Sequence, residues 1–241
     1  MAESAVDIKQ LFEAGAHFGH KTSRWNPKMR EYIYGKAGEI HLIDLAKTAD
    51  AIESAQKFLS GVAQSGKQIL FVGTKKQAQS IAKIAAEATN NPCVINRWVG
   101  GMLTNTTTVL SQIKKLKGLE KRMDSGELAN RYNKLEVQRY QEEIDSLEFK
   151  YGGIKDIHGK LGAVIILSAA DDHLAVQEAG KLGIPTVAII DTNADPTEVK
   201  YPIPANDDAI SALQLITDYL VEAIRQGQAK IVKEAETKGE K

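Results

Sequence analysis

The sequence predicts an α/β protein in which a doubly wound parallel sheet carries an inserted antiparallel coiled-coil helical hairpin. Short runs of Val, Ile and Leu alternate with amphipathic helical segments, a pattern typical of a parallel sheet covered on both faces. Right-handed crossovers between such strands make the sheet doubly wound. From Asn96 to Tyr151 the alternation gives way to two long, charged, helical segments. Because such a hairpin is not needed to close the core of the sheet, it is the first candidate for a functional contact.

Apolar runs and apolar periodicity locate the individual elements. Repeats of three and four residues predict helices over residues 6–18, 48–64, 75–88, 172–182 and 207–225. Strands are predicted over residues 39–45, 67–72, 93–96, 163–167, 185–190 and 201–203. The α/β domain is therefore expected to be discontinuous, over residues 1–98 and 154–226, with the hairpin insertion at residues 99–153. The polar, charged residues 227–241 are expected to form a disordered tail.

The second arm of the hairpin carries the heptad pattern of a coiled coil. Apolar and tyrosine side chains recur there at spacings of three and four residues, at Val137, Tyr140, Ile144, Leu147 and Tyr151. The first arm has a single acid, Glu120, among basic residues, which are Lys114, Lys115, Lys117, Lys121 and Arg122. A short turn at residues 124–126 is expected to join the arms. This concentration of positive charge suits an anionic partner, although a solvated coiled coil carries similar charges.

Composition places the chain among ordinary globular proteins. Its 241 residues are 43% hydrophobic and 26% charged, which suits one large domain with an appendage. The formal net charge is zero, so only the local distribution of charge can point to a nucleic-acid partner. A single cysteine, Cys93, allows no intramolecular disulfide and fits a reducing compartment. Without a signal peptide or an apolar run of about 18 residues, the chain is expected in the cytoplasm, outside membranes.

Basic and aromatic residues interleave in the N-terminal stretch over residues 20–38, which has no clear periodicity and is expected to be irregular. Its cations are Lys21, Arg24, Lys28, Arg30 and Lys36, opposed by the single acid Glu31. Its large aromatic residues are Trp25, Tyr32 and Tyr34. Cations bind phosphates and aromatic rings stack on unpaired bases, so this mixture favours contact with RNA. The alternative is a solvated irregular loop that packs its aromatic side chains inward.

The ends of the predicted strands are polar enough to host a ligand, and the carboxyl edge of an open α/β sheet is the usual place for one. Neither phosphate-binding glycine motif is present, and the turn at residues 73–75 has one glycine, which makes a poor phosphate cradle. The lone cysteine lies in a strand, and no serine stands in a nucleophile elbow. The sequence therefore predicts no enzyme, no cofactor and no small-molecule substrate.

A metal site is a weaker possibility. His17 and His20 are three residues apart, a spacing that brings two ligands together on a helical turn. Carboxylates that follow later strands complete a candidate set, namely Asp191, Asp195 and Asp207. Against this, Asp207 stands where a helix N-cap belongs, and capping is the commoner role for such a residue.

Several blocks of sequence resemble the S-two family of bacterial small-subunit ribosomal proteins. They read LFEAGAHFGH, RWNPKM, ILFVGTKKQA, NRWVGGMLTN, GGIKD, GIPTVAIIDTNADP and IPANDDA, and they follow the family order from Leu11 to Ala209. The resemblance implies a flavodoxin-like sheet with an inserted coiled coil and no catalytic activity. It also implies a structural role in the small ribosomal subunit, with small-subunit (16S) rRNA and neighbouring ribosomal proteins as partners. The recruitment of ribosomal protein S-one is part of that expectation.

The same resemblance implies which residues contact RNA. By motif they are Lys21, Arg24, Trp25, Lys28, Arg30, Arg97 and Trp98. The hairpin residues Lys114, Lys115, Lys117, Lys121 and Arg122 are added by charge alone. Two other classes of function remain open at this point. One is an α/β enzyme or nucleotide-binding domain that uses the strand ends, and the other is a coiled-coil interaction module outside the ribosome.

Overall fold

A parallel sheet of five strands forms the centre of the computed structural model. The structure describes residues 6–239; for Ala129 and residues 232–239 it describes the backbone alone. Its strands are β4 (Ile69–Val72), β5 (Cys93–Val94), β6 (Ala163–Ile166), β7 (Thr186–Ile190) and β8 (Tyr201–Pro204). They lie in the order β5-β4-β6-β7-β8, and every neighbouring pair is parallel. Counted from β4, this is the order 2-1-3-4-5 of flavodoxin-like sheets. The predicted parallel α/β sheet is confirmed.

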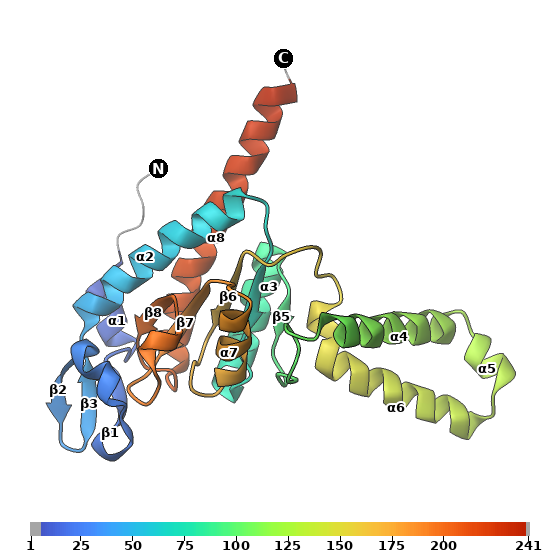
Figure 1. The fold of residues 1–241 in the computed structure, drawn as a ribbon, viewed down its shortest axis with the longest axis horizontal. Helices are drawn as coiled ribbons and strands as arrows, with labels where there is room; N and C mark the ends of the chain where they lie inside the picture. Colours follow the sequence, from blue (N-terminus) through green and yellow to red (C-terminus); the bar gives the residue numbers. More distant parts are fainter. Residues whose placement is uncertain (1–5, 240–241) are drawn as a thin grey trace.

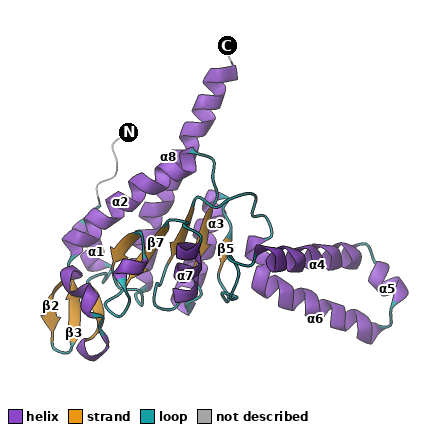
Figure 2. Ribbon diagram, in the orientation of Figure 1, coloured by secondary structure: helices purple, strands orange, loops and turns teal. Residues whose placement is uncertain are grey.

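Helices cover both faces of this sheet (Figures 1 and 2). One face packs against α2 (Leu45–Gln64), α3 (Lys76–Thr89) and α8 (Ile210–Gly239), and the other against α7 (His173–Lys181). Successive strand residues alternate between the two cores, so Phe71 lies in the first and Val72 in the second. This alternation explains why the strands read as unbroken apolar runs, since both faces need apolar side chains.

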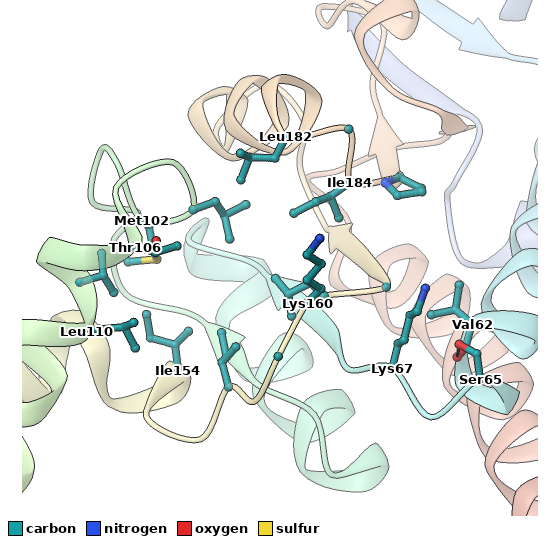
Figure 3. Close-up of a pocket in the computed structure, with 18 of the residues that line it drawn as sticks. Val62, Ser65, Lys67, Met102, Thr106, Leu110, Ile154, Lys160, Leu182 and Ile184 are labelled. Atoms are coloured by element: carbon teal, nitrogen blue, oxygen red, sulfur yellow. Dashed lines mark hydrogen bonds between the residues drawn. The ribbon is translucent and has the colours of Figure 1, made fainter.

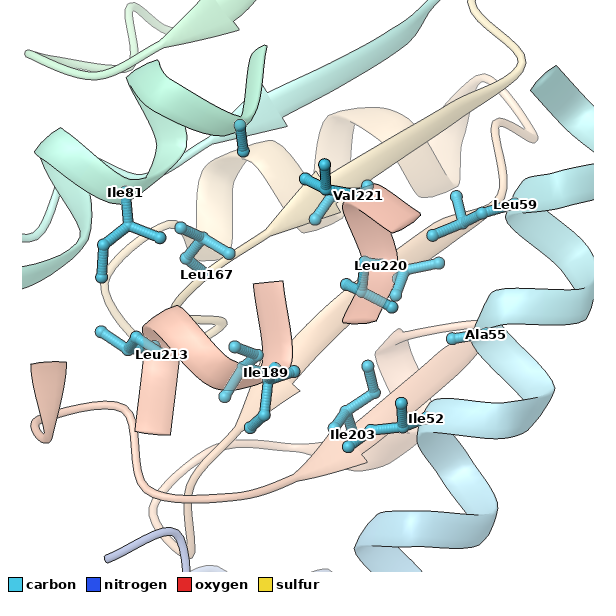
Figure 4. Packing of buried hydrophobic residues seen from close by; sticks show 14 of the residues in the cluster. Ile52, Ala55, Leu59, Ile81, Leu167, Ile189, Ile203, Leu213, Leu220 and Val221 are labelled. Carbon is cyan, nitrogen blue, oxygen red and sulfur yellow. The ribbon is translucent and has the colours of Figure 1, made fainter. Parts of the chain in front are cut away.

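The larger core lies between the sheet and the α2–α8 pair (Figure 4). Ile52 and Leu59 of α2, Leu213 and Leu220 of α8, and Ile189 of β7 meet there, each at most 1% exposed. Burying a side chain of this size contributes about 1.5–3 kcal/mol. Gly227 allows α8 to approach α2 closely, because a Cβ there would collide with the carbonyl oxygen of Ser60.

The basic N-terminal stretch is not an irregular loop, and this part of the prediction is wrong. After α1 (Ile8–Glu13), the chain forms an antiparallel sheet of β1 (Phe18–Lys21), β2 (Ile33–Ala37) and β3 (Ile40–Ile43). The 3-10 turns Thr22–Arg24 and Pro27–Tyr32 join β1 to β2. Register shifts in both strand pairs break the period of two that reveals a strand. The strand predicted over residues 39–45 therefore belongs to this small sheet and not to the parallel one.

A helical arm leaves the sheet after β5 and returns before β6. It consists of α4 (Thr106–Asp124), α5 (Glu127–Arg131) and α6 (Lys134–Tyr151), with α4 and α6 side by side. The expected turn at residues 124–126 is followed by α5, so the connection at the far end is longer than predicted. Figure 1 shows that this arm and the small antiparallel sheet lie at opposite ends of the molecule.

In the segment expected to be a disordered tail, residues 227–239 are helical, because α8 continues to Gly239. Beyond Gly227 it contains no proline and is rich in the good helix formers Ala, Lys, Gln and Glu. Residues 1–5 and 240–241, which belong to the predicted domain and tail, lie outside the described residues. Across residues 6–239, no helix is both long and apolar enough to cross a membrane.

Candidate nucleic-acid interface

Three of the cations predicted to contact RNA are exposed on the small antiparallel sheet and its turns, and none of them is paired with a described acid. Lys21 ends β1, Arg24 lies in the first 3-10 turn and Arg30 in the second. Within residues 6–239 none of the three forms an ion pair. The second turn is held in place by Met29, which is fully buried, and by the backbone N–H of Asn26, which donates to the carbonyl of Thr192 at 2.7 Å. The small sheet therefore positions these charges on a fixed surface.

Lys28 and Trp25 belong to the same stretch but are already engaged. The Lys28 ammonium donates to Asp195 Oδ2 at 2.6 Å and to Thr197 Oγ1 at 3.1 Å, across 167 and 169 residues of chain. The Trp25 ring lies 5.0 Å from the ring of His41 and is half-buried. Lys28 therefore ties the stretch to the segment that follows β7, whereas Trp25 packs within the small sheet, and the sequence pattern revealed neither contact.

Of the two neighbouring residues Arg97 and Trp98, both predicted to contact RNA, the first lies on the surface and the second in the core. Arg97 is exposed, whereas Trp98 is 7% exposed, and its indole N–H donates to Glu178 Oε1 at 3.0 Å. A buried ring has no free face for a base, so Trp98 is a packing residue here and the predicted RNA contact at this position is corrected. Arg97 alone of the pair is free to meet a phosphate.

Glu178 is the residue that organises the base of the arm, and sequence reasoning missed it. Besides Trp98, its carboxylate accepts from the backbone N–H groups of Gly101 (2.7 Å), Leu103 (3.0 Å) and Thr104 (3.1 Å), and from the Thr104 hydroxyl (3.1 Å). Burial acts to raise the pKa of Glu178, but these donors outweigh it and lower the pKa. On an amphipathic helix such as α7, a glutamate reads as a solvated residue, so no signal in the sequence marked it.

The basic residues of the arm differ in whether they form ion pairs with acids of the same chain. Lys114 and Lys121 are exposed and make no ion pair with the described part of the chain. The other three are paired within the arm or at its base: Lys115 with Glu143, Lys117 with Asp156 at 3.0 Å, and Arg122 with Glu127 at 3.0 Å. Lys114 and Lys121 are thus the residues of this set most available to an anion.

At the carboxyl edge of the sheet, the structure brings together His20, Asp191 and Asp207. Each offers a ligand atom, and these atoms lie within 4.8 Å of one another. His17 is not part of the group, since its ring stacks on Phe12 at 4.4 Å. His17 lies in the turn before β1 and His20 lies on β1, so the two do not share the helical turn on which a spacing of three brings ligands together. Asp195 is also absent from the group and pairs with Lys28 instead.

The carboxylates of this cluster already have cationic partners. Lys75 Nζ lies 2.7 Å from Asp207 Oδ1 and 2.7 Å from Asp208 Oδ1, and although burial opposes the charge, these hydrogen bonds raise the pKa of Lys75. The hydrogen bond with Asp191, at 3.1 Å, likewise raises the pKa of His20. Imidazole and carboxylate suit zinc or a similar ion, but here the His20 imidazole and the Lys75 ammonium already occupy the carboxylates.

Other polar side chains at the carboxyl edge of the sheet also form hydrogen bonds with one another. The Thr74 hydroxyl donates to Asp172 at 2.7 Å, and the Ser168 hydroxyl donates to Asp207 at 2.6 Å. Gly73 packs closely on Ala78 and Ala82, so the turn needs a glycine for packing against α3. These contacts argue against a nucleotide-binding site at the strand ends, which was one of the alternative functions.

The chain is similar in sequence to proteins of a known family. A model of the family described as "Ribosomal protein S2" matches residues 11–227 of this chain. The chain is also similar to the "Small ribosomal subunit protein uS2" of Coprothermobacter proteolyticus, with 44% identity over 225 residues. The aligned region covers 93% of this chain and 84% of that protein.

Proposed function

The chain belongs to the ribosomal protein S2 family, and from that premise we propose that it binds the RNA of the small ribosomal subunit. Membership of the family makes it a structural protein of the small ribosomal subunit in the cytoplasm, and not an enzyme.

The observation that carries the proposal is the group of exposed, unpaired cations on the small sheet: Lys21, Arg24 and Arg30. The chain as a whole is neutral, so three exposed cations within residues 21–30 that have no described acidic partner are a local feature. Contacts with phosphates are sequence-independent and position a protein on folded RNA. Arg97, exposed at the base of the arm, adds a further cation of this kind.

We infer that the arm over residues 99–153 acts as an antiparallel coiled coil, separate from the α/β domain of residues 1–98 and 154–226, and reaches toward RNA. In support, Ile113 and Leu116 of α4 and Ile144 and Leu147 of α6 are buried together, the arrangement a heptad seam produces. Lys114 and Lys121 lie outside this seam, where they are free to contact phosphates.

Contacts with other ribosomal proteins, including the recruitment of ribosomal protein S-one, form the second part of the proposal. Phe12 is 60% exposed and Tyr34 is 80% exposed, both near the N-terminal end of the chain. Exposed aromatic side chains of this size favour a protein interface. The family resemblance supplies the identity of the partner.

Sedimentation with small subunits tests the RNA contact of the small sheet. We compare the full chain with a variant that carries Lys21→Glu, Arg24→Glu and Arg30→Glu. The variant should occupy small subunits at least about tenfold less in sucrose gradients, because each reversal replaces a phosphate contact by repulsion. Unreduced occupancy would contradict the proposal.

The matched control is a surface control variant with Lys76→Glu, Lys83→Glu and Lys200→Glu. These lysines are exposed and lie outside the small sheet and its turns, two in α3 and one just before β8, and the change in net charge is the same. Its occupancy should equal that of the unaltered chain. Thermal unfolding of both variants confirms that each one is folded before it is mixed with subunits.

A further inference from the structure

An apolar groove of about 1030 Å³ lies between the α/β domain and the base of the arm (Figure 3). Its walls come from the C-terminal half of α2, the first turns of α4, residues 154–162 and residues 182–185. None of the cations proposed to contact RNA lines it. The groove is therefore a second surface, distinct from the RNA contacts.

The floor and walls of the groove are apolar and partly exposed. Leu110 of α4 is 53% exposed and Leu182, just after α7, is 49% exposed. Met102, Ile113 and Ile154 lie deeper and are buried. A large apolar surface open to water usually marks an interaction site. Phosphates and ribose gain nothing from such a floor, because burying polar groups without partners is unfavourable.

The rim of the groove is positive. Its lining includes Lys57, Lys67, Lys155 and Lys160 and no carboxylate. Lys155 is neutralised by Glu120 at 2.8 Å and by Glu148 at 2.6 Å. The other three are exposed and have no acidic partner among the described residues. Figure 3 shows Lys67 beside Val62, and Lys160 between Ile184 and Ile154.

We propose that this groove binds an acidic amphipathic segment of a partner protein. Such a segment lays its apolar face on Leu110 and Leu182 and directs its carboxylates to Lys57, Lys67 and Lys160. Recognition of a helix by an apolar groove follows this arrangement, and the lysines set its specificity and speed of association. An RNA strand would be attracted by the lysines of the rim but would gain nothing from the apolar floor. A neutral apolar peptide would pack on the floor but would leave the lysines without partners.

A designed peptide measures the binding directly. The probe is a fluorescein-labelled helix of about 18 residues, or about five turns, with Leu and Ile on one face and Glu on the other. Its affinity for the full chain is read by fluorescence anisotropy and compared with a scrambled peptide of the same composition. The amphipathic peptide should bind at least about tenfold more tightly. Equal affinity for the two peptides would overturn the proposal.

Variants of the chain locate the binding. A groove variant with Lys57→Glu, Lys67→Glu and Lys160→Glu should bind the peptide at least about tenfold more weakly. A floor variant with Leu110→Ser and Leu182→Ser should show a similar loss. The surface control variant should stay within about twofold of the unaltered chain. An equal loss in the groove and surface control variants would show a general charge effect and refute the assignment.

Cross-linking in assembled small subunits identifies the occupant. Leu110 is replaced by the photoreactive residue benzoylphenylalanine, and the adduct is mapped by mass spectrometry. The proposal expects an adduct to an acidic amphipathic protein segment, lost when the substitutions of the groove variant are added. An adduct to RNA, or to a segment without acidic residues, would overturn it. RNA binding by the small sheet is measured separately, so the two proposals succeed or fail independently.

Discussion

Glu178 shows how a single buried carboxylate holds an otherwise irregular segment. Between β5 and α4 the chain has no regular secondary structure, and its backbone N–H groups need acceptors. Glu178 supplies acceptors for Gly101, Leu103 and Thr104 and for the indole of Trp98. A charged acceptor of this kind makes hydrogen bonds roughly twice as strong as a neutral one. The base of the arm is thereby fixed to α7.

Replacing that carboxylate should destabilise the fold. Glu178→Gln puts an amide donor among N–H donors, and we expect a loss of about 3 kcal/mol in the free energy of unfolding, measured with urea. The pKa of Glu178 is lowered in the folded state, so its contribution is present above its unfolded pKa of about 4.3 and is lost as the pH falls through the folded value. Glu39→Gln, on an exposed residue, should cost less than about 0.5 kcal/mol. Equal costs for the two substitutions would refute this account.

Lys75 has a comparable role at the carboxyl edge of the sheet. Lys75→Met leaves Asp207, which is 1% exposed, without its cation, and we expect a cost of about 3–5 kcal/mol near pH 7. Burial raises the pKa of Asp207, so the folded state favours its protonated form and loses stability as the pH rises through that value. The cost measured by thermal unfolding should therefore be smaller near pH 5 than near pH 7. A cost that does not depend on pH would argue against an unpaired Asp207.

At the scale of elements, the two proposed RNA-contacting parts are built in opposite ways. The small sheet is fixed to the parallel sheet by Asn26 and Lys28, whereas the arm contacts the α/β domain only through its base (Figure 1). A surface held at several points presents its charges in one geometry, while a projecting pair of helices extends the reach of the protein. The contribution of each element's cations to RNA binding therefore has to be measured with separate variants.

The arm offers an internal comparison between free and paired lysines. Lys114→Glu with Lys121→Glu should lower the occupancy of small subunits more than Lys115→Glu with Lys117→Glu, since only the first pair is free of ion pairs among the described residues. The measure is co-sedimentation of the full chain in sucrose gradients, and the two double variants carry the same net charge. The opposite ranking, or no loss in either variant, would exclude Lys114 and Lys121 as phosphate contacts.

At the scale of the whole molecule, a net charge of zero conceals an uneven distribution. Unpaired cations occupy the small sheet at one end and the arm at the other, while the acids gather at the carboxyl edge and in α6. Affinity for RNA depends on how many phosphates are neutralised and not on the total charge. Such a protein is expected to bind RNA at its two ends without general affinity for polyanions.

Salt dependence measures the number of phosphate contacts. For the full chain binding to small-subunit RNA, Arg30→Gln should reduce the slope of log affinity against log salt by about 1. Lys28→Gln should leave the slope nearly unchanged, because Lys28 is paired with Asp195 at 2.6 Å. Filter binding over a range of salt concentrations provides both slopes. A similar reduction in the two variants would assign Lys28 to the RNA contact after all.

The sequence by itself determined the parallel α/β sheet, the family, and the positions of the strands and helices of that sheet to within a few residues, apart from the C-terminal end of α8. These depend on apolar periodicity and on long motifs, which are local in the chain. Only the tertiary structure decided that Trp98 is buried, that Lys28 is paired, and that His20 joins Asp191 while His17 does not. It also decided that residues 18–43 form a sheet of their own. The reason is physical: burial and ion pairing depend on partners far away in the chain, as for His20 with Asp191 and Asp208, and no local pattern records them.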